Sequence, residues 1–442
     1  MAATDVAKPD PEHPSEPAPA RASEPTSDLT AGVTSAAPPA CGLLAWAGYP
    51  WIVLLAATLV QTVASFGNQA ISPLAPFLVS DLGLARADIG LLVTATYLGG
   101  VLVLVVAGSL SDRFGVRALF LVGMVLAGVP LALGAAVPSY VWLLVPFALY
   151  GIGNGFALPP TTRAIVEWFP TRRRGVAMGI KQTGVALAGM ICGLLVPPLG
   201  EAIGWRGTVL VLGALTVVSG VLAWLLFRDR PDDLTGAPKP SRPPFRTVIR
   251  NRSLLLLSGV TFLYAGVQLS LAGFMVLFLI ERVGMGVTEA GAMLALAQAG
   301  GIVGRIGWGI VSDVVFGGRR KIVMAIFSVM AAVSSVVLSM TGPETPRIIL
   351  LVTLVAAGVS AIGWNGINML FVAEIAGRQA SATAAGLNLT ASYLGIMVGP
   401  PIFGYLVDQT GSYTTAFQVG AAASLASLLL LALIRAPEQT SS

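Results

Sequence analysis

Three basic side chains lie inside stretches of sequence that are otherwise almost wholly apolar: Arg163, Lys181 and Arg305. A charged residue at membrane depth is costly, so each one is a functional hypothesis by default. Lys181 lies about 10 Å into its apolar stretch, which is deep for a lysine that would extend to the membrane surface. We therefore expect Lys181 to contact an anion or to compensate charge along a polar path.

Arg163 has a local explanation. It stands four residues before Glu167, the spacing of an ion pair on one turn of a helix. We favour this pair over a contact of Arg163 with a substrate or a gate. The acids that we note near the apolar stretches, Glu167, Glu374 and Asp408, stand at their ends. The deep charges are therefore basic.

Composition decides the class of protein. The chain has 442 residues, of which 55% are hydrophobic and only 11% charged, whereas a soluble domain carries about 25% charged residues. So few charges exclude an ordinary soluble enzyme and a disordered chain. The basic residues are spread over short loops, so we expect no nucleic-acid partner. The composition predicts a protein with many membrane spans.

Histidine and cysteine exclude several kinds of site. The one histidine, His13, precedes the apolar stretches, so no histidine relay, metal site or serine–histidine pair is expected among them. We predict no catalytic residue, no metal and no cofactor. Cys41 and Cys192 are too few for a disulfide framework. Cys192 is expected to pack as a small apolar residue.

The apolar runs set the organisation of the chain, because about 20 apolar residues cross a bilayer as a helix. We count twelve: 51–77, 88–110, 117–137, 140–164, 175–200, 205–227, 253–281, 288–312, 321–341, 347–373, 380–407 and 413–434. The predicted fold class is an all-α polytopic membrane protein with 12 transmembrane helices in two six-helix bundles. The predicted parts are a disordered cytoplasmic tail (1–45), a first bundle (46–228), a cytoplasmic linker (229–252), a second bundle (253–435) and a C-terminal tail (436–442).

Basic residues predict the orientation. If both termini are cytoplasmic, 17 Lys and Arg residues beyond the first tail lie in cytoplasmic segments and four lie in outer loops. This bias follows the positive-inside rule and supports an even number of spans. We expect a multi-pass protein of the cell membrane with both termini in the cytoplasm.

The two halves of the chain repeat one another. Gly108-Ser-Leu-Ser-Asp112-Arg113-Phe-Gly115-Val-Arg117 ends the second run, and Gly309-Ile-Val-Ser-Asp313 ends the eighth. A Pro-Pro pair ends both the fifth run (Pro197) and the eleventh (Pro400). Because the two landmarks recur at nearly the same offset, we infer a parallel duplication of six spans.

The ten residues from Gly108 to Arg117 resemble a loop typical of the major facilitator superfamily, where it joins spans two and three on the cytoplasmic side. With the twelve runs and the repeat, the resemblance covers about residues 50–435. It implies that Asp112 and Arg113 latch the halves and balance the inward- and outward-open states. Topology anchoring alone is the alternative, and the second copy has Val314 in place of the arginine. The gating motif thus comprises Gly108, Asp112, Arg113, Gly115, Arg117 and Asp313.

Residues 151–179 resemble the branches of this family that carry organic anions, sugar acids and organic phosphates. The carboxylates through which some relatives couple protons have no match here, because Gly67-Asn68 and Phe156-Ala157-Leu158 fill those regions. For Arg305 the resemblance favours a structural role. It also implies which spans line the cavity, and this gives the candidate binding residues Asn68, Lys181, Gln182, Gln268, Gln298 and Asn365. Each amide alone is otherwise a contact between helices, worth about 0.6 kcal/mol.

We therefore predict a secondary active transporter that moves a small organic anion by alternating access between two bundles. The alternatives are an exporter of drugs or other hydrophobic compounds and, in a different class, a transporter-like membrane sensor. Expected partners are the small-molecule substrate, the lipid bilayer and a possible coupling ion. The protein is expected to be a monomer and not an enzyme.

Overall fold

The computed structural model describes residues 48–229 and 248–434, with side chains for all of these except 104–113, 171–172, 378–379 and 382. The predicted N-terminal tail, most of the linker and the C-terminal tail lie outside the described residues. All elements of the described part are helical. This follows from the apolar runs, since a helix satisfies its own backbone hydrogen bonds within lipid.

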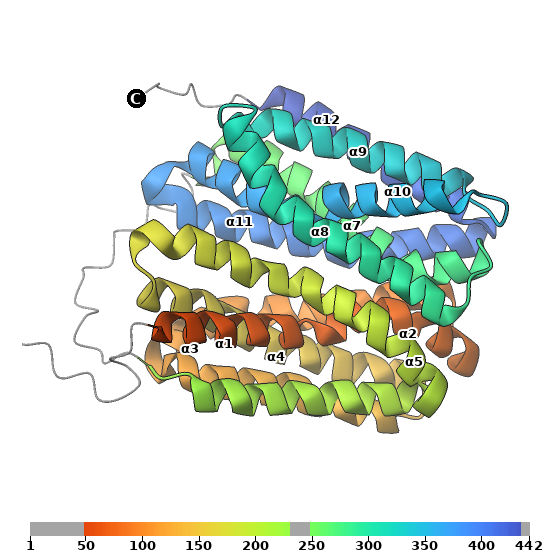
Figure 1. Ribbon diagram of the computed structural model, residues 1–442, viewed down its shortest axis with the longest axis horizontal. Coiled ribbons are helices and arrows are strands. Elements are labelled where there is room, and N and C mark those ends of the chain that lie inside the picture. The colour runs from red at the N-terminus through yellow and green to blue at the C-terminus, as the bar shows by residue number, and fades with distance from the viewer. Residues whose placement is uncertain (1–47, 230–247, 435–442) are drawn as a thin grey trace, which may run out of the picture. The chain divides into compact units, whose positions relative to one another are not determined.

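The first six-span half has five helical elements and one short 3₁₀ turn (Figure 1). They are α1 (Tyr49–Ala64), α2 (Phe66–Leu82), α3 (Arg86–Leu133), η2 (Gly134–Ala136), α4 (Tyr140–Trp168) and α5 (Thr171–Leu226). The second half contains α7 (Arg252–Glu281), α8 (Val287–Val314), α9 (Arg320–Met340), α10 (Arg347–Ala357), the π-helical η4 (Gly358–Ile362), α11 (Asn365–Thr410) and α12 (Tyr413–Leu433).

Three of these helices contain a reversal. Gly115 in α3, Gly204 in α5 and Gly377 in α11 have φ of 80°, 71° and 71°, in the left-handed region that glycine tolerates best. Figure 1 shows the two arms of α5 running back from the turn at Gly204. The described residues contain 11 candidate spans. One of them, Arg173–Leu226, holds two crossings, so the twelve predicted crossings agree with the structure.

Two spans are less regular than the sequence suggested. The first predicted run is divided at Ser65 between α1 and α2, and the tenth is interrupted between α10 and α11. Tyr150 and Asn154 of α4 support the first break, since both donate hydrogen bonds to the carbonyl of Ala64. Chain breaks at membrane depth are tolerated where neighbouring helices satisfy the backbone in this way.

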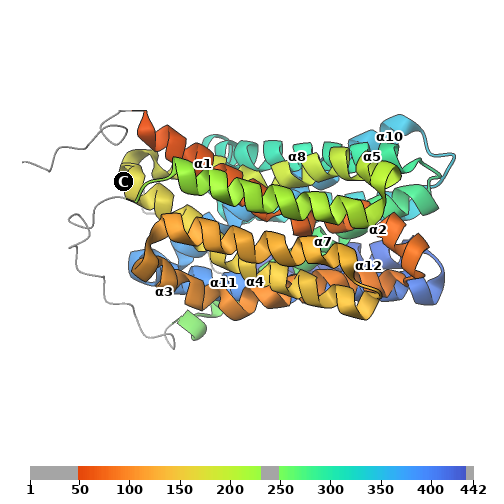
Figure 2. The same ribbon diagram turned by 90° about the horizontal axis from the view of Figure 1, so that it is seen from below.

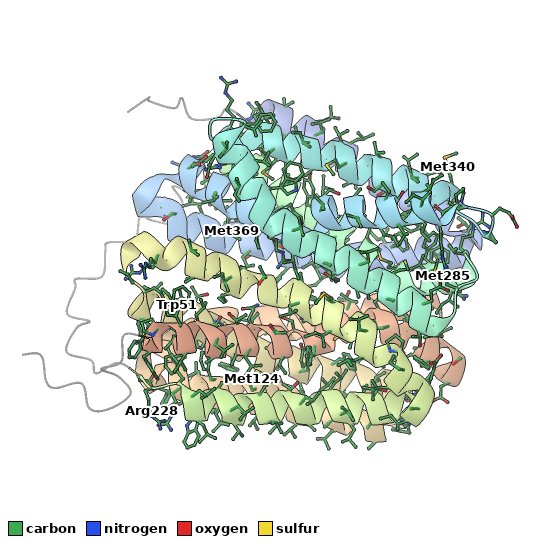
Figure 3. All side chains as sticks on the ribbon, in the orientation of Figure 1. Trp51, Met124, Arg228, Met285, Met340 and Met369 are labelled. Carbon is green, nitrogen blue, oxygen red and sulfur yellow. The ribbon has the colours of Figure 1, made fainter. Side chains whose placement is uncertain are left out.

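The outer surface of the bundle is apolar. Large hydrophobic side chains are exposed along the second arm of α5, along α9 and along α12, for example Val218, Val333 and Leu429. Figure 3 shows side chains rich in carbon around the helices, with Arg228 at one end and Met285 and Met340 at the other. This pattern fits helices that face lipid.

Candidate substrate site and gates

The two halves meet along two antiparallel helix pairs, which we call seams. In the first seam, the first arm of α3 packs against the second arm of α11: Thr94 Oγ1 donates to the carbonyl of Met397 at 2.6 Å, and the rings of Tyr97 and Tyr393 lie 5.5 Å apart. In the second seam, the first arm of α5 packs against α8, as Figures 1 and 2 both show. There, a Cβ on Gly193 would lie 2.6 Å from the carbonyl oxygen of Gly291.

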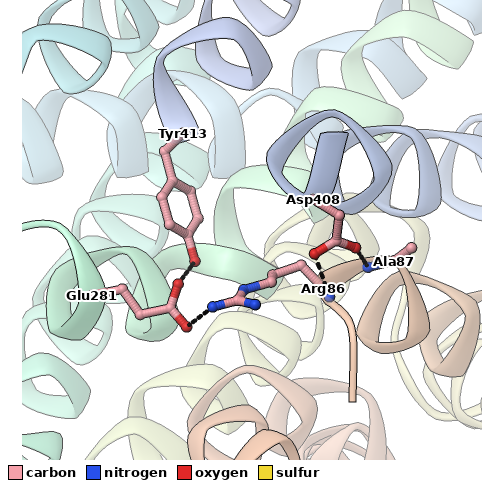
Figure 4. Close-up of polar contacts among 5 residues, drawn as sticks. All are labelled: Arg86, Ala87, Glu281, Asp408 and Tyr413. Carbon is pink, nitrogen blue, oxygen red and sulfur yellow. Dashed lines mark hydrogen bonds and ion pairs between the residues drawn. The ribbon is translucent and has the colours of Figure 1, made fainter. Parts of the chain in front are cut away.

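At one end, which we call the far end, a polar network closes the first seam (Figure 4). Arg86 Nη2 lies 3.0 Å from Glu281 Oε1, and the Tyr413 hydroxyl donates to Glu281 Oε2 at 2.8 Å. Asp408 accepts the backbone N–H groups of Arg86 at 3.0 Å and of Ala87 at 2.8 Å. A carboxylate at the first turn of a helix satisfies donors that have no partner within the helix. Arg86, Glu281, Asp408 and Tyr413 thus tie α3 of the first half to α7, α11 and α12 of the second.

At the opposite end, which holds the loop at Gly115 and which we call the motif end, the seams separate. Gly175 and Gly179 of α5 and Gly307 and Gly309 of α8 have no atom within 4 Å of the place a Cβ would take. Gly386 of α11 is equally free. On the closed side of this opening, a ring contact joins Tyr97 to Tyr393 across the first seam, and a hydrogen bond joins Arg305 to Gln182 across the second. The structure is therefore closed at the far end and open toward the motif end.

Lys181 lies where the second seam begins to open. Its side chain is 4% exposed, and Nζ donates to Thr162 Oγ1 of α4 at 2.9 Å. In the described part of the chain, no carboxylate lies within ion-pair distance of Nζ. A buried ammonium with one neutral partner is poorly stabilised, so an anion would stabilise it.

Arg305 reaches across the same seam. Its Nη1 donates to the carbonyl oxygen of Gln182 at 2.5 Å and its Nε to that of Ile362 at 3.2 Å. Both acceptors are neutral, and Arg305 has no ion pair with any carboxylate that the structure describes. Because Gln182 follows Lys181 in α5, Arg305 of the second half bonds the backbone next to Lys181 of the first half, where the second seam opens. The sequence favoured a structural role for Arg305 and did not place it beside Lys181.

Irregular backbone of the second half positions Arg305. The π-helical η4 and the turn after it lie against α8, and glycines allow this approach, since a Cβ on Gly304 would lie 2.5 Å from the carbonyl oxygen of Val359. Trp308 Nε1 donates to the carbonyl of Val359 at 3.1 Å, one turn beyond the bond from Arg305 to Ile362. Carbonyls of this segment thus accept donors from α8.

The remaining predicted residues fall into separate groups. Arg163 and Glu167 form the predicted pair on α4. Gln268 Oε1 accepts from Trp364 Nε1 at 2.8 Å and from Asn365 Nδ2 at 3.4 Å, so Gln268 and Asn365 come together. Gln298 lies in the second seam beside Gly189. The backbone N–H of Asn68 donates to the hydroxyl oxygen of Tyr150 at 3.3 Å. Cys192 is buried, as predicted.

The motif loop shows an unexpected partner. Asp229 Oδ1 accepts the N–H groups of Val116 at 2.8 Å and Arg117 at 3.2 Å, and a Cβ on Gly115 would lie 2.9 Å from Asp229 Oδ2. The guanidinium of Arg117 lies 4.2 Å from the ring centroid of Trp224. Gly115 therefore permits the turn and also leaves room for a carboxylate from the end of α5. The side chains of Asp112 and Arg113 lie outside the described residues.

In the second copy of the motif, Arg320 pairs with Asp313 at 2.5 Å and with Glu374 at 3.1 Å. It also donates to Ser312 Oγ at 2.8 Å. The arginine that is missing at position 314 is thus supplied from the start of α9. The sequence contained Arg320 in a basic cluster, but its spacing from Asp313 gave no reason to pair them.

Sequence reasoning missed the far-end network. The acids noted near the ends of the spans left out Glu281, although it closes a predicted run. A signal was available: acids at the ends of two spans (Glu281, Asp408) and an arginine at the start of another (Arg86) stand at the same side of the predicted topology.

Apolar helices in two halves, with seams closed at one end and open at the other, are typical of a membrane transporter with two bundles. A sequence profile described as Major Facilitator Superfamily matches residues 57–400. The chain belongs to this superfamily and is a multi-pass secondary transporter, not an enzyme.

Named relatives agree with this assignment. The chain is 27% identical over 405 residues to a probable sulfoacetate transporter, SauU, of Cupriavidus necator, covering 84% of this chain and 91% of that protein. It is 24% identical over 406 residues to a hexuronate transporter of Bacillus subtilis, covering 87% and 94%.

Solved structures share the fold. A bacterial homolog of the human lysosomal transporter Spinster, in an inward-facing and occupied conformation, matches with a TM-score of 0.68 at 19% identity, covering 88% of this chain and 95% of that one. The nucleoside transporter NupG matches with a TM-score of 0.71 at 14% identity, covering 86% and 99%.

Proposed function

We propose that this transporter carries a small organic anion and binds its acidic group between Lys181 and Arg305. One observation carries the proposal: the buried Lys181 of the first half, and Arg305 of the second half, which bonds the backbone of the next residue, have neutral partners only among the described residues. An anion between them would replace the carbonyl of Gln182 as the partner of Arg305. The names of the relatives, which concern sulfoacetate and hexuronate, support an anionic cargo.

The seams support alternating access. Because the same helix pairs are in contact at the far end and apart at the motif end, a rocking of one half against the other would exchange the open end for the closed one. The predicted cytoplasmic segments, which include the loop at Gly115, hold 17 basic residues and the predicted outer loops hold four, which favours a cytoplasmic motif end. The structure would then be the inward-open state, with both termini in the cytoplasm of a cell-membrane protein.

The coupling ion belongs to the same proposal. The described residues contain no group of three or more His, Cys, Asp or Glu side chains that could hold a metal ion. We propose that the protein transports the anion as a monomer. Any coupling ion would bind without such a cluster.

The test is thermal stabilisation of the purified protein by carboxylates, inorganic anions, sugars, and cationic and neutral apolar drugs. A ligand at about 100 times its Kd adds roughly 2.7 kcal/mol. We expect stabilisation by organic anions only, lost in Lys181→Ala and kept in the control Arg282→Ala, which removes an exposed arginine. Stabilisation of both variants by apolar drugs, and not by anions, would replace the proposal with export of hydrophobic compounds.

Transport completes the test. Proteoliposomes loaded with an anion that stabilises the protein should exchange it for the labelled anion outside, and Lys181→Ala should reduce this exchange at least tenfold. Unchanged exchange in Lys181→Ala would remove Lys181 from the site.

A further inference from the structure

A second polar layer lies in the second seam, two helical turns farther from the opening than Arg305. Gly189 of α5 faces Gln298 of α8, and the side chain of Gln69 from α2 reaches the same point. A Cβ at position 189 would overlap the amide nitrogens of both glutamines, so the absence of a side chain makes room for them. The layer therefore joins the two halves through neutral amides.

The hydrogen bonding of this layer is incomplete. Gln298 is 2% exposed, and its Oε1 accepts no hydrogen bond from the described residues. Gln69 Nε2 donates to the carbonyl of Val185 over 3.3 Å, and the side-chain oxygen of the neighbouring Asn68 is buried without a partner as well. A buried amide oxygen without a donor is unfavourable. A donor group from a ligand would stabilise this layer.

The layer is aligned with the cation pair. Arg305 and Gln298 are seven residues apart on α8, so they share one face at about 10 Å along the helix axis. Gln182 and Gly189 have the same spacing on α5. A ligand bound between the halves with its acid at Lys181 and Arg305 would therefore reach the level of the amides with its other end.

We propose that Gln69 and Gln298 are specificity-determining residues that bind hydroxyl groups of a hydroxylated carboxylate, such as a sugar acid. The inference rests on the proposed anion function. A hydroxyl both donates to an amide oxygen and accepts from an amide nitrogen, so it satisfies Gln298. An alkyl chain of the same length would leave that oxygen unpaired. A site built to bind a hydroxyl discriminates strongly against analogues that lack it.

The experiment compares gluconate with hexanoate, which have the same carbon chain with and without hydroxyls. Binding is measured by thermal shift on the purified full chain. We expect the wild type to bind gluconate at least tenfold more tightly than hexanoate. Gln298→Leu, which has a similar volume and no hydrogen-bonding group, should raise the Kd of gluconate at least tenfold and leave that of hexanoate unchanged.

Two further variants keep the test decisive. Gln69→Leu changes a half-buried residue on another helix and should have the same selective effect if Gln298→Leu does not fold. Gly189→Ala should weaken gluconate binding by displacing both amides. The melting temperature without ligand reports the fold of each variant.

Three results would overturn the proposal: equal binding of the two acids by the wild type, an unchanged preference in the glutamine variants, or an equal loss of both acids, which would indicate a structural role. Binding of neither acid by the wild type, where other organic anions bind, removes only this inference. Binding of no anion at all removes the proposed function with it.

Discussion

The two ends of the seams differ in what holds the halves together. At the far end, the carboxylate of Asp408 caps the first turn of α3 and Arg86 pairs with Glu281, while glycines allow backbones to touch below them. At the motif end, glycines of α5, α8 and α11 face open space. Glycines of the same helices thus allow the backbones to touch at one end and leave space between the helices at the other. Which end is closed depends on a few polar contacts and on backbone fit.

The largest effect is expected from removing that backbone fit. Gly291→Ala places a Cβ against the carbonyl of Gly193 and the ring of Pro197, so the far end cannot close as it does here. We expect a loss of anion transport of more than tenfold and a shift to states open at the far end. Distances between spin labels on α3 and α11 at that end, measured by double electron–electron resonance, would report the shift.

The matched control is Gly307→Ala, which lies on the same helix and meets no atom within 4 Å in this state. It should leave the distances at the far end unchanged. If both variants open the far end equally, close glycine contact is not what distinguishes the two ends.

A smaller effect is expected from the far-end network, and its two parts should differ. Asp408→Asn weakens the cap on two backbone N–H groups, a role worth about 0.5–2 kcal/mol. Glu281→Gln breaks a pair whose side chains are 35% and 26% exposed, so water screens it and about 0–1 kcal/mol is expected. The population with an open far end should therefore rise more in Asp408→Asn.

Accessibility of a cysteine at Ala87 to a water-soluble maleimide measures this population. Phe316 lies at the motif end. Labelling of a cysteine at this position is the reference that separates opening of the far end from a general loss of packing. A larger change in Glu281→Gln than in Asp408→Asn would reverse the ranking and make the ion pair the main contact.

The smallest effect compares two turns of the motif end that have similar backbones. Gly115→Ala and Gly377→Ala both force alanine to a positive φ with an extended ψ, a conformation essentially confined to glycine, which costs about 1–3 kcal/mol. Only at position 115 would the new Cβ also crowd the carboxylate of Asp229. Thermal unfolding should therefore show a larger loss of stability for Gly115→Ala. Equal losses would mean that Asp229 moves aside without cost.

Much of the fold followed from the sequence because membrane helices depend on local composition. The crossings, the glycine turn at position 115 and the Arg163–Glu167 pair each depend on residues close together in the chain. The breaks at Ser65 and at residues 358–364 did not follow, because Tyr150, Asn154 and α8 support them from other helices.

The candidate site was only partly predictable. Lys181 stood out as a deep charge without a nearby acid. The meeting of Arg305 with Gln182 joins residues 123 positions apart, and the bond of Asp408 to Arg86 spans 322. The register between helices of different halves is set by packing, and the pattern within each helix does not contain it.

The irregular turn of the tenth span has a consequence for the evolution of this protein. Arg305 rests on the carbonyl of Ile362, at the end of the π-helical segment. Substitutions among uncharged residues there would straighten the backbone and move the guanidinium without altering any charge. Under the proposed role of Arg305, such substitutions in an apolar helix would alter the preference for a substrate although no charged residue changes.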